Sequence, residues 1–262
     1  MRRRDPGAVP GGAEGELLLG FNAVESALES ERREVQRVWV EKGRDRGRVA
    51  RLRDLARRHG AIVEEVDRAR LERLAAGQPR SAHQGVVASV AALPYADPDA
   101  ILAGCGPEAL VLVADGVEDP RNLGALVRTA AGAGAAGVFI PSRRAAGLSA
   151  TAARAAAGAL ERTPVARVGN VSEFVKKLKQ MDFWTVGLDA ASSRPWDRTR
   201  YPRRVALVVG GEGEGLRRLV RESCDEVVSL PLAGGVESLN LSVAAGVVLY
   251  EVVRQRRAGV FT

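Results

Sequence analysis

Cysteine, histidine and aromatic residues are scarce in this chain. Its 262 residues include two cysteines, two histidines and 4% aromatic residues. Cys105 and Cys224 stand far apart, and His59 and His83 complete no zinc-binding spacing with them. The sequence therefore predicts no metal and no disulfide framework, as is typical of a protein from a reducing compartment.

Long hydrophobic runs are absent as well. No apolar stretch reaches the roughly 20 residues that a membrane-spanning helix needs. The start of the chain, MRRRDPGAVPGGAEGE, is rich in arginine but is not followed by the apolar core of a signal peptide. We therefore expect a cytoplasmic protein without a membrane partner, in which residues 1–15 form a disordered leader.

Positive charge is in excess. The net charge of +7 favours a polyanionic partner such as a nucleic acid, and the 46% of hydrophobic residues can supply a core. Arginines gather on one face of a helix expected at residues 44–59. That face allows two interpretations, namely contact with RNA phosphates or a solvated surface with nearby acids such as Asp54.

Alternating helix and strand patterns divide the chain into two α/β parts. Residues 16–92 predict a small domain that ends in the β-rich segment SAHQGVVASV. Residues 93–108 are rich in Pro, Gly and Asp, as expected for a linker. Residues 109–262 alternate apolar strands with helices, which predicts an open, mostly parallel sheet with helices on both faces.

Three conspicuous loops follow strands of this predicted sheet: Asp115–Asn122, Gly210–Gly215 and Leu230–Asn240. Ligands of open α/β sheets bind at the carboxyl ends of the strands, so we expect the site at these loops. The last loop leads into an unusually apolar helix from Leu241. Such a helix must be buried on several sides, inside a core or against a second subunit.

The third loop combines a glycine turn with two short polar side chains. Gly234 and Gly235 allow the chain to reverse through positive φ angles. Ser238 falls at the expected N-cap of the following helix, and Asn240 lies two residues later. Free backbone N–H groups and two polar side chains are therefore expected to converge there.

Two other glycine patterns are not nucleotide-binding motifs. Gly132–Gly137 matches G-x-G-x-x-G, but it follows a helix and precedes a strand, the reverse of a dinucleotide-binding turn. The GEGEG sequence at Gly211–Gly215 lacks the Lys-Ser/Thr of a P-loop, and its two carboxylates would repel phosphates. This second loop suits a cationic or neutral ligand.

Taken together, three segments resemble the motifs of the SpoU, or TrmH, family of RNA ribose 2′-O-methyltransferases. They are DGVEDPRNLGALVRTA (Asp115–Ala130), VVGGEGEGL (Val208–Leu216) and LPLAGGVESLNLSVA (Leu230–Ala244). The N-terminal part, with its closing HQGVVA, resembles the L30e-like RNA-binding domain of that family. Within the family, the chain looks closest to the bacterial enzymes that methylate a guanosine ribose of 23S rRNA.

This resemblance implies a SPOUT fold with a deep trefoil knot, S-adenosyl-L-methionine as cofactor, ribosomal RNA as partner and a homodimer. The family pattern places the cofactor at the backbone around Gly210, Leu230, Gly235 and Leu239. It places a polar catalytic cluster at Asn122, Arg128, Glu212, Ser238 and Asn240.

Each catalytic candidate also has a purely structural interpretation. Asn122 could cap a helix that begins at Leu123, Arg128 could be a surface arginine, and Ser238 could be only an N-cap. The family proposal gives Arg128 the role of general base, but a guanidinium holds its proton in proteins. We therefore prefer a positional role for Arg128, gripping the target phosphate, and expect Glu212 to anchor its loop or the nucleotide.

Two further functions stay open. One is a tRNA or antibiotic-resistance rRNA 2′-O-methyltransferase with the same chemistry. The other is a ribosome-assembly protein that binds RNA without methylating it. A protein that only binds RNA has no need for a converging polar cluster, so the cluster favours the enzyme.

Overall fold

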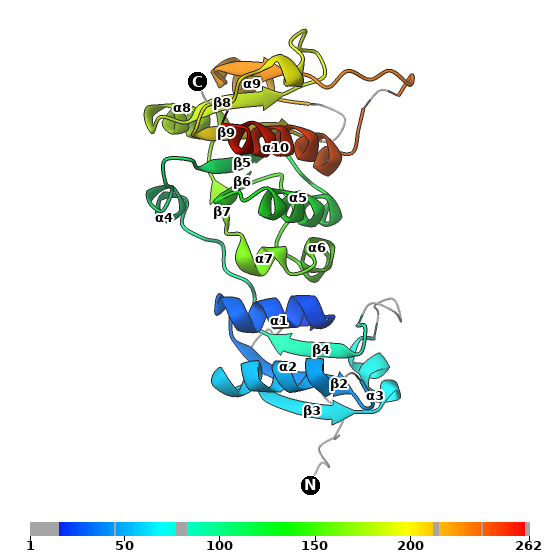
Figure 1. Ribbon diagram of the computed structural model, residues 1–262. Helices are drawn as coiled ribbons and strands as arrows, with labels where there is room; N and C mark the ends of the chain where they lie inside the picture. Colours follow the sequence, from blue (N-terminus) through cyan, green and yellow to red (C-terminus); the bar gives the residue numbers. More distant parts are fainter. Residues whose placement is uncertain (1–15, 45, 77–82, 212–214, 237, 260–262) are drawn as a thin grey trace. The chain divides into compact units, whose positions relative to one another are not determined.

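A computed structural model describes most of the chain (Figure 1), namely residues 16–44, 46–76, 83–211, 215–236 and 238–259. These residues form two compact units with their boundary between Pro94 and Tyr95. The expected leader, residues 1–15, lies outside the described residues.

The N-terminal unit is the small α/β domain that the sequence predicts. Its elements are β1 (Glu16–Leu19), α1 (Phe21–Ser30), β2 (Val35–Glu41), α2 (Arg46–Arg58), β3 (Ile62–Val66), α3 (Arg68–Leu74) and β4 (Val86–Val90). The strands form one mixed sheet in the order β1-β4-β2-β3. Strand β4 is antiparallel to β1 and β2, whereas β2 and β3 are parallel.

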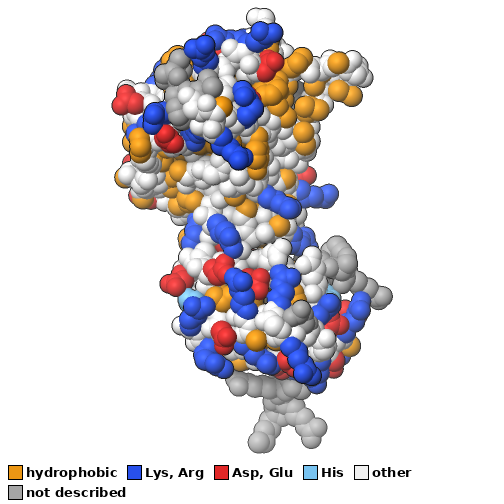
Figure 2. All heavy atoms as spheres, viewed as in Figure 1, with side chains coloured by type: hydrophobic (Ala, Val, Ile, Leu, Met, Phe, Trp, Pro, Cys, Tyr) orange, Lys and Arg blue, Asp and Glu red, His pale blue; other side chains and the backbone are white. Residues whose placement is uncertain are grey.

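Arginines of α2 engage carboxylates of their own unit. Arg51 pairs with Glu29 at 2.7 Å, Arg53 pairs with Glu65 at 2.6 Å, and Arg48 forms a further pair with α1. Figure 2 shows Lys and Arg side chains interspersed with Asp and Glu on the visible face of this unit. Paired arginines offer less charge to RNA phosphates, so this helix fits the solvated-surface interpretation better.

The C-terminal unit is built on a six-stranded sheet in which all strand pairs are parallel. Its strands are β5 (Leu110–Asp115), β6 (Gly137–Pro141), β7 (Val165–Val168), β8 (Trp184–Leu188), β9 (Val205–Gly210) and β10 (Glu226–Val228). Their order in the sheet is β10-β8-β9-β5-β6-β7. The predicted open parallel sheet is therefore confirmed.

Helices cover both faces of this sheet. They are α4 (Pro98–Ala103), α5 (Pro120–Gly132), α6 (Ala150–Ala156), α7 (Ala159–Arg162), α8 (Val171–Gln180), the 3₁₀ helix η1 (Trp196–Arg198), α9 (Arg218–Ser223) and α10 (Leu241–Arg257). Helices α4, α8 and α9 share a buried cluster with Val111, Phe139 and Val208. Helix α10 packs against α5 and β9. Burial on both faces explains why these strands are apolar almost throughout.

The segment expected to be a linker, residues 93–108, belongs to the C-terminal unit from Tyr95 onward. The Tyr95 hydroxyl accepts hydrogen bonds from the backbone N–H of Leu148 at 3.2 Å and from the guanidinium of Arg167 at 2.9 Å. Helix α4 buries Leu102 in the core. Composition predicts a linker with a short helical patch at residues 93–108, but it does not reveal these long-range contacts.

Two neighbouring glycines at the end of β9 pack tightly: Gly210 against Gly215 of its own loop, and Gly211 where that loop crosses Gly116 after β5. A Cβ atom on Gly210 would lie 2.0 Å from the carbonyl carbon of Gly215, and one on Gly211 would lie 2.8 Å from the oxygen of Gly116. Only glycine permits such approaches between backbones. The crossing brings the loops after β5 and β9 together at one edge of the sheet.

We predict that Gly210→Ala lowers the free energy of unfolding by about 2–3 kcal/mol, because the added methyl group overlaps backbone atoms that cannot rotate away. Urea unfolding followed by circular dichroism measures the change. Gly169→Ala is the matched control, since an added Cβ there meets nothing within 4 Å. Equal effects of the two substitutions would contradict a tight packing of Gly210 against Gly215.

Candidate active site

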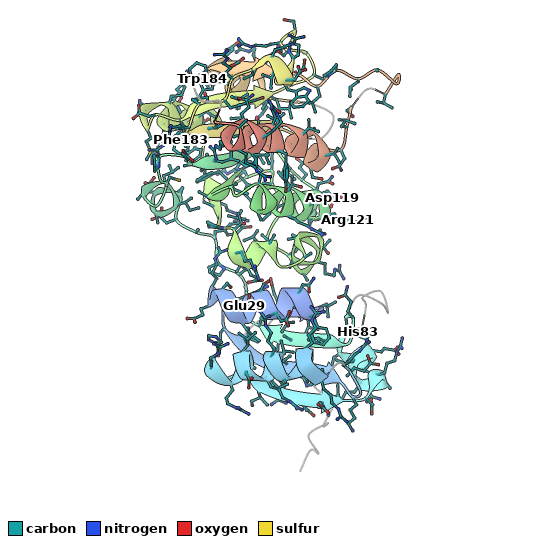
Figure 3. The ribbon with its side chains drawn as sticks, in the orientation of Figure 1. Glu29, His83, Asp119, Arg121, Phe183 and Trp184 are labelled. Atoms are coloured by element: carbon teal, nitrogen blue, oxygen red, sulfur yellow. The ribbon has the colours of Figure 1, made fainter. Side chains whose placement is uncertain are left out.

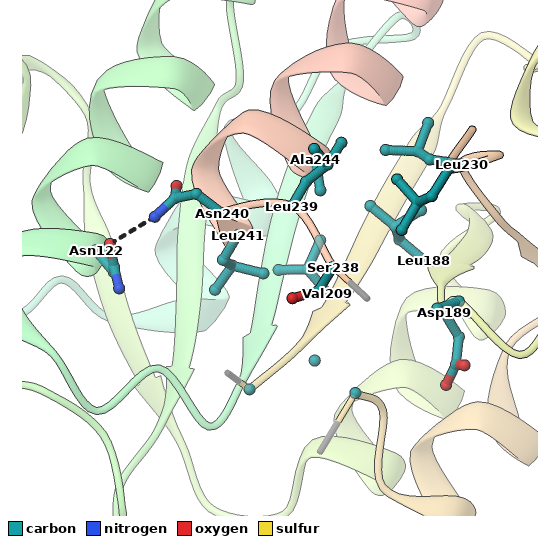
Figure 4. Close-up of a pocket in the computed structure, with 15 residues that line it drawn as sticks. Asn122, Leu188, Asp189, Val209, Leu230, Ser238, Leu239, Asn240, Leu241 and Ala244 are labelled. Carbon is teal, nitrogen blue, oxygen red and sulfur yellow. Dashed lines mark hydrogen bonds between the residues drawn. The ribbon is translucent and has the colours of Figure 1, made fainter. Parts of the chain in front are cut away.

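A cavity of about 390 Å³ opens at the carboxyl edge of the C-terminal sheet (Figure 4). Its walls include Leu188, Val209, Leu230 and Leu239, and the carboxylate of Asp189 adds a negative charge. Residues from all three predicted loops line it together with the end of β8. The site therefore lies where the parallel-sheet rule predicts a ligand.

Six of the predicted site residues line this cavity: Asn122, Gly210, Leu230, Ser238, Leu239 and Asn240. Arg128 is exposed on α5 and does not line it, and neither does Gly235. Gly235 instead adopts a φ of 69° in the turn before α10. Glu212 lies outside the described residues.

Asn122 and Asn240, 118 residues apart in the sequence, meet at the cavity. The Nδ2 of Asn240 donates a hydrogen bond to the Oδ1 of Asn122 at 3.1 Å (Figure 4). The Oδ1 of Asn240 accepts from the backbone N–H of Ser242 at 3.0 Å, so Asn240 is the N-cap of α10. The expectation that Ser238 caps this helix is wrong, because the helix begins two residues later than that cap requires.

Asp119, rather than Asn122, caps α5. Its Oδ1 accepts a hydrogen bond from the backbone N–H of Arg121 at 2.7 Å, and the helix begins at Pro120 (Figure 3). The interpretation of Asn122 as a helix cap is therefore wrong. Asn122 lies within the first turn of α5, from which its side chain reaches Asn240.

An ion pair anchors the end of the second loop to β5. The Nε of Arg217 donates to the two carboxylate oxygens of Asp115 at 2.9 and 3.0 Å. The Asp115 side chain is fully buried, and its hydrogen bond is the main cause that raises the pKa of Arg217. This pair holds the residues before α9 against the strand that precedes Asn122.

Sequence reasoning missed Leu188 and Asp189, because no family motif was recognised after β8. The backbone N–H of Asp189 donates to the carbonyl oxygen of Val228 at 3.0 Å, which continues the pairing of β8 with β10. Its Oδ1 accepts from the backbone N–H of Ala191 at 2.8 Å. A carboxylate directly after a strand of this sheet was the available signal.

The described residues contain no group of three or more His, Cys, Asp or Glu side chains able to hold a metal ion. Among the described helices, none has the length and apolar character needed to cross a membrane.

Known family models match both units of the chain. The SpoU rRNA Methylase family matches residues 109–250, and the RNA 2′-O ribose methyltransferase substrate binding family matches residues 17–96. The TrmH family tRNA/rRNA methyltransferase YacO of Bacillus subtilis is 41% identical over 92% of this chain and 96% of its own. The 23S rRNA (guanosine-2′-O-)-methyltransferase RlmB of Xylella fastidiosa is 41% identical over 91% of this chain and 96% of its own.

A solved structure agrees with these matches. The SpoU methyltransferase AviRb from Streptomyces viridochromogenes, in complex with the cofactor AdoMet, has a TM-score of 0.76 at 26% identity. The alignment covers 93% of this chain and 91% of that chain. Fold, site and similarity together define an S-adenosylmethionine-dependent RNA 2′-O-ribose methyltransferase. The chain belongs to the SpoU rRNA methylase family.

We predict that Asn240→Asp abolishes most methyl transfer without destabilising the protein. Asp keeps an oxygen for the N-cap, and its charge is favourable at a helix N-terminus. It cannot donate to Asn122, so the Asn122 amide must turn over to keep a hydrogen bond, and the polar pair presents different groups to the cavity. Thermal unfolding and transfer of labelled methyl groups measure the two effects.

Asn240→Ala provides the comparison. It removes the cap as well as the donor and is expected to cost about 1 kcal/mol of stability. Full activity of Asn240→Asp would show that the arrangement of donor and acceptor in the Asn122–Asn240 pair has no part in the reaction.

Proposed function

We propose that this enzyme methylates the ribose 2′-hydroxyl of a guanosine in 23S rRNA and acts in the cytoplasm, where that RNA is found. The similarity to RlmB of Xylella fastidiosa carries this proposal, because it extends over nearly the whole of both chains. The match of residues 17–96 to a substrate-binding family supports an RNA substrate. A tRNA is the second candidate, since the name of the Bacillus subtilis relative includes both kinds of RNA.

In this proposal S-adenosylmethionine binds the cavity at Gly210, Leu230 and Leu239. The cofactor supplies a methyl group on a positively charged sulfonium. Apolar walls suit its uncharged parts, the Asp189 carboxylate suits its positive charge, and Gly210 lets the backbone come close. Gly235 then shapes the loop rather than contacting the cofactor.

The polar residues would align the attacking ribose and manage its proton. An in-line attack depends on orientation, which can contribute several kcal/mol to a lower barrier. Asn122 and Asn240 form a fixed polar pair at the cavity and would orient the ribose or its neighbours. Ser238 lines the same cavity, and Glu212 keeps its proposed role as an anchor of the second loop or of the nucleotide.

Arg128 fits a role outside the chemical step. It is exposed on α5 and lies outside the lining of the cavity. An exposed arginine near a site for RNA can grip a phosphate through charge-assisted hydrogen bonds. This placement supports phosphate binding over proton abstraction.

We also propose that the enzyme is a homodimer. Val236, Leu239, Val243 and Tyr250 expose 56%, 40%, 53% and 52% of their surface. Val243 and Tyr250 are seven residues apart and share a face of α10. Figure 2 shows hydrophobic side chains gathered on the side of this unit where the loop before α10 lies. A second copy of this surface would cover them and border the cavity at Leu239.

The proposed reaction predicts labelled methyl transfer from S-adenosylmethionine to 23S rRNA isolated from cells that lack the enzyme. Mapping should find a single 2′-O-methylated guanosine. 16S rRNA and total tRNA are the matched controls and should accept no label. Transfer to tRNA alone would favour the second candidate, and cofactor binding by calorimetry without any transfer would contradict the proposed substrates.

For Arg128→Lys we predict that RNA affinity falls less than tenfold, because lysine keeps a positive charge for the phosphate. Methyl transfer should fall further, since lysine lacks the bidentate geometry of arginine. Filter binding and single-turnover kinetics separate the two effects. Unchanged affinity together with complete loss of transfer at every pH would instead indicate a chemical role.

The proposed interface predicts that Val243→Glu yields a monomer in light scattering, because a buried unpaired charge opposes association. Leu219→Glu is the control, since Leu219 is 58% exposed on α9, away from α10. The control should keep the mass of the dimer. A monomeric wild-type protein would refute the interface.

A further inference from the structure

A second cavity, of about 480 Å³, adjoins the first and shares Gly211 and Gly215 with it. Its other walls come from the loop after β5 and the loop after β6. We propose that this cavity binds the base of the target guanosine and that Arg143, Arg144 and Glu118 read its edges. The inference rests on the proposed function and deepens it by assigning residues to the choice of base.

The position of the cavity suits a base. A nucleobase is attached to the carbon next to the one that carries the 2′-hydroxyl. When that hydroxyl faces a methyl group in the first cavity, the base must lie a few ångströms to one side. Gly211 and Gly215 line both the first and the second cavity, so the two lie next to each other.

Two arginines supply hydrogen-bond donors to this cavity. Arg143 and Arg144 follow β6, are exposed, and pair with no carboxylate among the described residues. Arg217 also lines the cavity, but its guanidinium is already paired with the carboxylate of Asp115. Arginine is the side chain that most commonly recognises the O6 and N7 acceptors of guanine.

The carboxylate of Glu118 favours a base over a phosphate as the ligand of this cavity. It lines the same cavity, is exposed, and forms no ion pair with a described residue. A carboxylate would repel a phosphate, but it accepts hydrogen bonds from the N1–H and N2–H groups of guanine. Donors and an acceptor in one cavity therefore match guanine better than a phosphate group.

The backbone at Arg144 gives further support. Its φ of 54° lies in the left-handed region, which is uncommon for residues other than glycine, asparagine and aspartate. Such conformations concentrate at sites that bind ligands. Asparagine tolerates this φ well, so Arg144→Asn removes the guanidinium without adding strain.

The test compares methyl transfer to three 23S rRNA transcripts that carry guanosine, inosine or adenosine at the position methylated by the wild-type enzyme. Arg143→Gln/Arg144→Asn should lower the guanosine-to-adenosine ratio of kcat/KM about tenfold or more. Glu118→Gln should lower the guanosine-to-inosine ratio, because inosine lacks the N2 amino group. Cofactor affinity by calorimetry should stay unchanged, since these side chains do not line the first cavity.

Arg218→Gln is the matched control, because Arg218 is exposed at the start of α9, pairs with Glu222 and lines neither cavity. It should leave both ratios unchanged. Wild-type ratios in the Arg143/Arg144 and Glu118 variants would overturn the assignment. So would an equal loss of affinity for all three transcripts, which indicates phosphate contact. Absence of transfer by the wild-type enzyme to any RNA would overturn the proposed function as well.

Discussion

The close packing of backbone at Gly210 and Gly211 is the constraint on which the site depends. Gly210 packs against Gly215 of its own loop and Gly211 against Gly116 after β5, so a side chain at either glycine would collide with backbone. The Asp115–Arg217 ion pair then secures the far end of that loop to the same strand. The end of β5 and the loop after β9, about a hundred residues apart in the sequence, thus form one wall, with a cavity on each side.

The hydrogen bond between Asn122 and Asn240 joins the third loop to this arrangement. It links the first turn of α5 to the N-cap of α10. Because both helices pack against each other in the core, the bond fixes the polar residues relative to the apolar walls. Such preorganisation suits a reaction that depends on alignment more than on strong acids or bases.

Much of this architecture could be predicted from the sequence. The apolar strands, the parallel sheet and the three loops follow from hydrophobic pattern and from the rule that ligands bind at the carboxyl ends of strands. The family motifs alone place Asn122, Gly210 and Asn240 in one site. The SpoU assignment and the cofactor, S-adenosylmethionine, are confirmed by the family match and by the AdoMet complex.

Other features depend on contacts that a local pattern cannot reveal. The N-caps of α5 and α10 are Asp119 and Asn240 rather than Asn122 and Ser238. The sequence offers two polar candidates for each cap, and only the folded helix shows which one is used. Tyr95 is part of the C-terminal unit through partners more than fifty residues away. The trefoil knot that the family resemblance implies is a matter of global threading and stays a prediction.

A crystal structure with S-adenosylhomocysteine bound would show whether the cofactor occupies the first cavity. Its sulfur should lie between Gly210 and Leu239 and face the Asn122–Asn240 pair. Ligand density outside this cavity, or a sulfur turned away from that pair, would contradict the proposed site.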